Sequence, residues 1–329
     1  MKRMWRTALL VLFAAVPIAE AAGAPSGTIH VYTSQPSDQM ALVVAAFAKS
    51  VPGVKVDLFR SGTTEVMSKL AAEFAAGRPQ ADVVLIADAV AATQLKNDGR
   101  LLAYPQAPTS KMPPALIDPD RTFFGTKLIT TGIVYNTNLV KTPPKSWNDL
   151  LAPDAAAKTI MPDPLYSGAA SIHVGTMVQQ PEFGWRYFET LAKNGAIAGQ
   201  GNGSVIEAVA RGEKAYGIII EYMAFNAKRK GSPVDFVFPV EGVSAISQPV
   251  AILKTTANPE AAKAFVDWQL SAEAQEQSVA QGYFPISSDL QSPPGYPPVS
   301  ALKIMPADFR DLLAKDEENK KKFTELFGG

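Results

Sequence analysis

One pattern recurs three times near the start of the chain, in TIHVYTSQ (residues 28–35), VKVDLFRSGTT (54–64) and ADVVLIAD (81–88). Each stretch opens with apolar and β-branched residues, as a strand does, and ends in small or polar residues. A helical pattern follows each one, with apolar residues four positions apart, as at Val66 and Leu70. Strands that alternate with helices in this way predict an open parallel sheet with helices on both faces.

The alternation continues through the rest of the chain without an internal repeat of sequence. Further strands are predicted at residues 127–135, 158–161, 195–200, 215–220 and 246–253, and helices from near Gly168, Ser204 and Met223 and over residues 259–281. The predicted fold class is α/β, with two lobes that are each a mainly parallel sheet flanked by helices. Because ligands collect at the carboxyl ends of such strands and between domains, we expect a small-molecule site in the cleft between the lobes.

The composition excludes several kinds of function. The 329 residues carry 31 basic and 31 acidic side chains, so the formal net charge is zero. A balanced charge gives no electrostatic case for nucleic acid or for an anionic membrane as a partner. The sequence contains no cysteine, which excludes disulfides, thiolate metal sites and a cysteine nucleophile.

The first 24 residues have the layout of a secretory signal peptide. Lys2, Arg3 and Arg6 precede an apolar run over residues 7–18, and small residues continue to Ala24. An uncleaved membrane anchor is the alternative, but the run is shorter than the roughly 20 residues that span a bilayer. We therefore predict a signal peptide at residues 1–24, export to the periplasm, and no membrane insertion after cleavage.

Loops that follow the predicted strands combine hydroxyl side chains, glycines and helix starts. A helix N-terminus offers free backbone N–H groups and a partial positive charge, which suit a phosphate-like or carboxylate anion. Three such termini facing one cleft could hold a dianion without any Arg or Lys; the alternative is that the polar residues are ordinary helix N-caps. The predicted ligand-binding residues are Tyr32, Thr33, Ser34, Ser61, Gly62, Thr63, Asp88, Ser167, Gly168, Ala169, Asn202, Glu221 and Tyr222.

The carboxylates and tyrosines in this set have more than one interpretation. Asp88 and Glu221 could bind a cationic amine or a metal, or Asp88 could cap a helix and Glu221 could be solvated. Tyr32 and Tyr222 could flank a ligand or belong to the core or its rim.

The sequence offers little support for catalysis. It contains no G-x-S-x-G elbow, P-loop, H-E-x-x-H pair or G-x-G-x-x-G fingerprint. Its two histidines, His30 and His173, fall inside a predicted strand and a predicted helix, and we expect both to be structural. We therefore predict no enzyme activity, no catalytic residue, no cofactor and no resident metal.

Several segments resemble a known family. Residues 29–35, 59–67 and 81–84 are similar to the first lobe of type II periplasmic binding proteins, and more narrowly to their ferric-ion-binding branch. Thr131-Gly132-Ile133-Val134-Tyr135-Asn136 resembles their crossing strand, and Ser146-Trp147-Asn148-Asp149-Leu150 their S/T-W-x-D-L turn. The resemblance implies lobes joined by two crossing strands, with lobe 1 at residues 26–126 plus 246–329 and lobe 2 at 127–245. It also implies a monomer that closes on a small ligand and docks on an ABC permease of the inner membrane.

The resemblance leaves the ligand open. Ferric-binding members carry two consecutive tyrosines where this chain has Glu221-Tyr222, and a first-lobe His that is missing after Gln35. Other members of the branch carry phosphonates or phosphate esters on Ser/Thr-rich helix starts. We therefore predict a small organophosphorus anion or zwitterion, with 2-aminoethylphosphonate as the leading candidate. The alternatives are ferric iron or another metal held by Tyr222, Glu221 and a synergistic anion, a sensor subunit, and a hydrolase or transferase.

Overall fold

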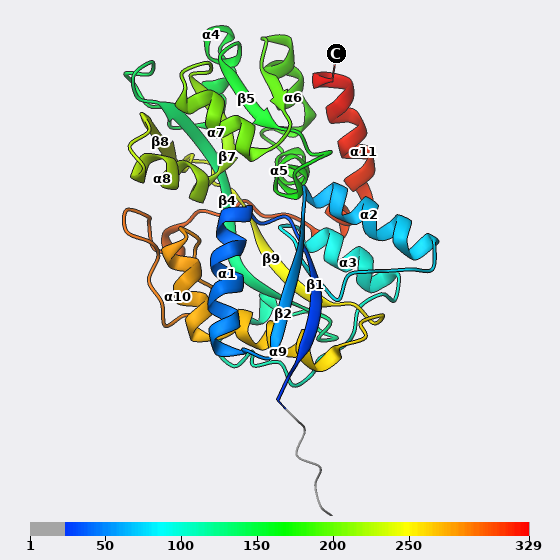
Figure 1. The fold of residues 1–329 in the computed structure, drawn as a ribbon. Coiled ribbons are helices and arrows are strands. Elements are labelled where there is room, and N and C mark those ends of the chain that lie inside the picture. The colour runs from blue at the N-terminus through cyan, green and yellow to red at the C-terminus, as the bar shows by residue number, and fades with distance from the viewer. Residues whose placement is uncertain (1–23, 329) are drawn as a thin grey trace, which may run out of the picture.

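The computed structural model describes residues 24–328, which form two lobes stacked one above the other (Figure 1). The strands are β1 (Gly27–Thr33), β2 (Val54–Arg60), β3 (Val83–Leu85), β4 (Phe123–Asn136), β5 (Thr159–Pro162), β6 (Ile197–Gly199), β7 (Tyr216–Ile220), β8 (Val234–Val237) and β9 (Ser244–Ile252). The helices are α1 (Ser37–Ser50), α2 (Thr63–Ala75), α3 (Ala89–Asn97), α4 (Pro153–Ala156), α5 (Gly168–Gln179), α6 (Gly184–Lys193), α7 (Asn202–Ala210), α8 (Glu221–Arg229), α9 (Pro259–Gln269), α10 (Ala272–Ala280) and α11 (Phe309–Phe327). The predicted signal peptide lies outside the described residues, apart from Ala24.

All nine of these strands belong to one hydrogen-bonded sheet, in the order β2-β1-β3-β9-β4-β7-β5-β6, with β8 also paired to β4. In the first lobe β1 pairs in parallel with β2 and β3, and in the second lobe β5 pairs in parallel with β6 and β7. The long strand β4 pairs with β9 from Phe123 to Thr131 and with β7 and β8 near Tyr135. Strands β4 and β9 thus run from one lobe into the other (Figure 1).

Each lobe buries apolar side chains on both faces of its part of the sheet. In the first lobe Phe47 of α1 packs against Phe265 of α9, with ring centroids 5.1 Å apart. On the opposite face, Val66 and Leu70 of α2 are fully buried. The apolar period seen in the sequence therefore marks the face of α2 that covers the sheet.

The C-terminal helix α11 packs against both lobes, and more extensively against the second. Residues 246–329 were assigned to lobe 1, but α11 lies against α5 and α6 of the second lobe as well as against α3 of the first (Figure 1). Phe323 of α11 is 1 % exposed and shares a core cluster with Trp147 and Phe188. The apolar face of α11 is therefore buried mainly by residues of the second lobe. The predicted lobe boundaries stay predictions.

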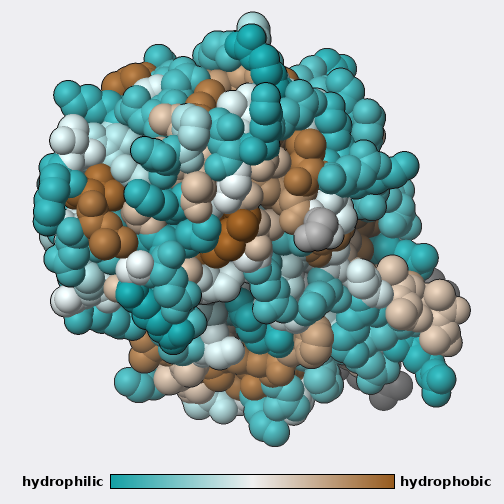
Figure 2. All heavy atoms as spheres, turned by 90° about the horizontal axis from the view of Figure 1, so that it is seen from above, coloured by the Kyte–Doolittle hydropathy of each residue, from teal (hydrophilic) through white to brown (hydrophobic). Residues whose placement is uncertain are grey.

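The helix predicted over residues 259–281 is two helices, α9 and α10. The hydroxyl of Ser271 accepts a hydrogen bond from Ala274 N at 3.3 Å and so caps a new helix start. Among the described residues, no helix is both long and apolar enough to cross a bilayer. Seen from the second-lobe end, the surface is mainly hydrophilic, with small separate hydrophobic patches (Figure 2).

Candidate functional site

A cleft of about 320 Å³ lies between the lobes, at the carboxyl ends of their strands. Its walls come from the loops after β1, β2 and β3 of the first lobe and after β5, β6 and β7 of the second. Eight of the predicted ligand-binding residues line it: Ser34, Gly62, Thr63, Ser167, Gly168, Ala169, Asn202 and Tyr222. The rule that places ligands at strand ends thus brings residues from both lobes to one site.

Helix N-termini open onto this cleft without side-chain caps. Helices α1, α2, α7 and α8 begin after Pro36, Gly62, Gly201 and Ile220, and no side chain caps any of them. Their first-turn N–H groups therefore stay available to a ligand oxygen. The N-cap interpretation holds for α5, where Ser167 Oγ accepts from Ala170 N at 3.2 Å, and for α3, which Asp88 caps.

Ser167 also belongs to a polar bridge within the second lobe. Its hydroxyl accepts from Asn202 Nδ2 at 3.0 Å, and Asn202 Oδ1 accepts from Ile220 N at 3.3 Å. Because a hydroxyl can accept two hydrogen bonds and donate one, Ser167 keeps its own proton to donate into the cleft. The bridge fixes the ends of α5, α7 and β7 relative to one another.

Arg60, the last residue of β2, is a cleft residue that the sequence analysis missed. The helix termini at the cleft are therefore accompanied by a guanidinium group. The guanidinium donates to Gln35 O at 3.3 Å, to Ser34 O at 3.4 Å and, across the cleft, to Tyr166 Oη at 3.3 Å. These bonds are long, and the side chain is exposed, so it can turn its donors toward an anion. Its position directly before Ser61-Gly62, at a strand end, was the available signal.

The two lobes touch beside the cleft. An added Cβ at Gly62 would lie 2.5 Å from the Tyr166 carbonyl oxygen, and one at Gly168 would lie 2.8 Å from Asp88 Cβ. No real side chain fits at such distances, so glycine is needed at both positions for this approach. The structure is therefore a closed arrangement of the lobes.

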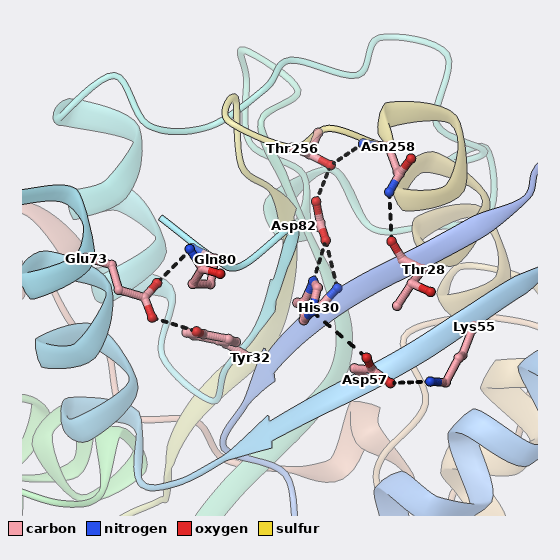
Figure 3. Close-up of polar contacts among 10 residues, drawn as sticks. All are labelled: Thr28, His30, Tyr32, Lys55, Asp57, Glu73, Gln80, Asp82, Thr256 and Asn258. Carbon is pink, nitrogen blue, oxygen red and sulfur yellow. Dashed lines mark hydrogen bonds and ion pairs between the residues drawn. The ribbon is translucent and has the colours of Figure 1, made fainter. Parts of the chain in front are cut away.

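Three predicted residues of the first lobe point away from the cleft. Tyr32 packs on Phe59 and donates its hydroxyl proton to Glu73 Oε1 at 2.7 Å, on the α2 side of the sheet (Figure 3). Thr33 is fully buried and donates to Leu85 O at 2.7 Å. Ser61 does not line the cleft and is hydrogen-bonded to Glu65 in the first turn of α2. Side chains alternate between the faces of a strand, so a strand end near the cleft does not carry every side chain into it.

The two predicted carboxylates are buried and already hydrogen-bonded. Asp88 Oδ1 accepts from Val90 N at 2.8 Å and Ala91 N at 3.1 Å, and burial raises the pKa of this carboxyl to about 7. Glu221 Oε2 accepts from Thr130 N at 2.6 Å, and burial raises its pKa to about 8. Neither side chain lines the cleft, so in this arrangement neither is placed to receive an ammonium group or a metal, and Asp88 instead caps α3. In the described part of the chain, no acidic side chain lines the cleft.

The two histidines differ in their surroundings. His173 is buried, lies 3.0 Å from Ser244 Oγ through Nδ1, and packs on Trp147, as expected for a structural residue. His30 was also expected inside the protein, but its side chain is 49 % exposed and lies beside Asp82 and Asp57 (Figure 3). Neither histidine lines the cleft.

Comparison with known proteins agrees with this geometry. Residues 33–276 match the model of the bacterial extracellular solute-binding protein family. The chain belongs to this family. It is 27% identical over 306 residues to an uncharacterized protein of Haemophilus influenzae, covering 88% of this chain and 87% of the relative. It is also 27% identical over 289 residues to a probable ABC transporter periplasmic-binding protein of Sinorhizobium fredii, covering 83% and 78%.

Solved structures of periplasmic binding proteins share the fold. AfuA from Actinobacillus pleuropneumoniae, with exogenous fructose-6-phosphate bound, superposes with a TM-score of 0.84 at 25% identity over 92% of this chain and 99% of AfuA. Iron-bound HitA from Pseudomonas aeruginosa gives 0.79 at 21% identity over 90% and 99%. These matches confirm the two-lobe fold class.

The role follows from the family and its relatives. The protein is the solute-binding component of an ABC importer, so its partners are a small-molecule ligand and a membrane permease. It acts on the extracellular or periplasmic side of the membrane. Members of the family and the matching structures are binding proteins, and the prediction of a non-enzymatic role is confirmed.

Proposed function

We propose that this solute-binding protein captures a small organophosphorus anion, a phosphate ester or a phosphonate, in the interlobe cleft and delivers it to its permease. One observation carries the proposal: several uncapped helix N-termini and Arg60 face a cleft that no acidic side chain of the described residues lines. Backbone N–H groups and a guanidinium are the donors that proteins use for phosphorus oxyanions. We further propose that residues 1–24 are a signal peptide that directs export to the periplasm.

The walls of the cleft favour a neutral, hydroxylated substituent over an amine. An ammonium group held away from water needs a carboxylate partner, and Asp88 and Glu221 are buried behind the cleft walls. Amide and hydroxyl groups of Gln200, Asn202 and Ser204 line the cleft instead, and they suit a polyol. A sugar phosphate therefore fits better than 2-aminoethylphosphonate. AfuA, 25% identical, has fructose-6-phosphate bound.

Ferric iron, the alternative ligand, would have to use the phenols of the cleft. Tyr166, Tyr222 and Tyr283 line it, but burial raises the pKa of both Tyr222 and Tyr283 above the ordinary tyrosine value. The phenolate form that ferric iron prefers is thus costly to make here. The described residues contain no group of three or more His, Cys, Asp or Glu placed to hold a metal.

Thermal unfolding with a ligand panel tests the proposal. The protein is refolded to remove carried-over ligand and then heated with fructose 6-phosphate, 2-aminoethylphosphonate, methylphosphonate, inorganic phosphate, fructose or ferric citrate. A ligand at about 1,000 times its Kd adds roughly 4 kcal/mol, which raises Tm by roughly 5–15 °C. We expect this rise with an organophosphorus compound and none with fructose. A rise with ferric citrate alone would overturn the proposal.

Arg60→Gln provides the matching variant. It removes a charge-assisted hydrogen bond worth about 1.5–3 kcal/mol, so affinity for the phosphorus compound falls roughly tenfold or more. Arg78→Gln, which changes an exposed arginine outside the cleft, is the control and leaves affinity unchanged. Equal effects of the two changes would argue against a direct contact between Arg60 and the anion.

A further inference from the structure

Beneath the floor of the cleft lies a lysine that the site described above does not include. Lys127 of β4 is fully buried. The pairing of β4 with β9 shifts register between Gly125 and Leu128, so Lys127 stands in a β-bulge. Bulges change the direction of a side chain and are frequent beside functional sites. Here the side chain of the lysine in the bulge is buried inside the protein.

The ammonium group of Lys127 has polar and aromatic neighbours but no counter-charge. Nζ donates to Gln35 Oε1 at 3.0 Å and lies 4.4 Å from the centre of the Tyr283 ring. Within the described residues, none of the ion pairs includes Lys127. A buried, unpaired cation is costly, because the low-dielectric interior solvates it poorly. To avoid this cost, Lys127 must either lose its proton or receive a negative charge from outside the protein.

The neighbours of Lys127 are themselves part of the cleft. Gln35, Gln248 and Tyr283 line it, and Gln248 Nε2 donates to the same Gln35 oxygen at 3.4 Å. The side chains of Gln35 and Tyr283 thus lie between the ammonium group and the cleft. At that separation and in a partly buried setting, a charge on Lys127 and a charge on the ligand interact by more than they would in water.

We propose that Lys127 takes up a proton when an anion enters the cleft, so that capture is coupled to the charge of a lysine that never touches the ligand. This inference rests on the proposed function, because it needs an anionic solute. In an ordinary buried ion pair, a carboxylate of the protein neutralises the lysine. Here the anionic ligand does so. Lys127 is therefore a determinant of specificity for anions rather than a contact residue.

Other charged or titratable groups near Lys127 do not remove this coupling. Arg60 is cationic and bonds the backbone of Gln35, and the Tyr283 phenol is held neutral by burial. Tyr222, Glu221 and Asp38 act electrostatically on Tyr283. The pKa of Lys127 is lowered to about 7 by burial. The lysine is therefore poised to gain a proton near neutral pH.

The affinity for an anion should fall as pH rises, because an anion raises the pKa of Lys127 above its value in the empty protein. Its contribution to affinity is then full below about pH 7 and is lost as pH rises through the higher, ligand-bound value. A rise of one pKa unit makes affinity roughly tenfold weaker at high pH.

Isothermal titration calorimetry at pH 7.5, in three buffers of different ionisation enthalpy, counts the protons. The probe is fructose 6-phosphate, which is almost wholly dianionic at this pH because its second pKa is about 6. For a one-unit rise from pKa about 7, we expect uptake of roughly half a proton per ligand bound. Lys127→Met and Lys127→Gln abolish the uptake and weaken binding roughly tenfold at pH 6.5, but not at pH 9. The exposed Lys49→Met control behaves as the unchanged protein.

The outcomes separate the two proposals. Binding of fructose 6-phosphate with no proton uptake, or with the same uptake in Lys127→Met, overturns the role of Lys127 and leaves the proposed function intact. If fructose 6-phosphate does not bind, the titration is repeated with whichever organophosphorus compound of the panel raises Tm. If none does, the proposed function fails and the role of Lys127 fails with it. Circular dichroism confirms that each variant is folded.

Discussion

Replacing Lys127 by methionine also tests its burial in the ligand-free protein. Burial lowers the pKa of Lys127 from 10.5 to about 7, so between these values the unfolded chain binds more protons than the folded one. Stability therefore rises with pH across this window, and the full penalty is present below about pH 7. Each pKa unit is worth about 1.4 kcal/mol, and the penalty is therefore roughly 5 kcal/mol. Methionine has a similar length and no charge, so Lys127→Met removes the penalty.

Urea unfolding at pH 6 and pH 10 measures this effect. We expect Lys127→Met to exceed the unchanged protein in unfolding free energy by several kcal/mol at pH 6, with an advantage about 4 kcal/mol smaller at pH 10. Changes in packing are the same at both pH values and cancel in the comparison. Lys49→Met, at an exposed site, should change little at either pH. An advantage independent of pH would refute the reasoning, because it would show that Lys127 stays charged in the folded protein.

Three further predictions concern other parts of the structure. Gly62→Ala places a Cβ 2.5 Å from the Tyr166 carbonyl oxygen and should weaken ligand binding at least tenfold by calorimetry, with little change in ligand-free Tm; unchanged affinity would contradict closure of the lobes at this contact. Glu221→Gln replaces an acid whose pKa burial raises to about 8. Because the folded state then binds more protons than the unfolded state, the unfolding free energy of the unchanged protein falls as pH rises. Between pH 5 and pH 9 the unfolding free energy of the variant, measured with urea, should therefore rise by about 4 kcal/mol relative to that of the unchanged protein. Phe323→Ala empties a buried position of α11 and should cost about 3–5 kcal/mol in the same assay; a cost below 1 kcal/mol would mean that α11 does not complete the second-lobe core.

The local pattern of the sequence was enough to predict the alternation of strands and helices. The period of Val66 and Leu70 marks the buried face of α2, and such periods depend on neighbouring residues alone. The eight predicted residues that line the cleft follow from the same local information, because parallel strands of one sheet end at one edge.

The cleft residues that were placed wrongly or missed depend on contacts between segments far apart in the sequence. Whether a strand-end side chain such as Tyr32 enters the cleft depends on the pleat, which a slip of one residue reverses. Gln248 and Tyr283 reach the cleft only because β9 crosses back between the lobes. Lys127 is directed inward by a bulge that arises from pairing with a strand more than a hundred residues away. A single sequence contains no direct signal for such pairings.

The packing of α11 determines what the two ends of the folded chain can report. Strand β1 begins on the first lobe, whereas α11 ends against the second (Figure 1). Fluorophores attached before Gly27 and after Phe327 would therefore sit on separate bodies, and energy transfer between them would change as the lobes move. Labelling the two ends would therefore turn the protein into an optical sensor for its solute, without inserting a reporter into either lobe.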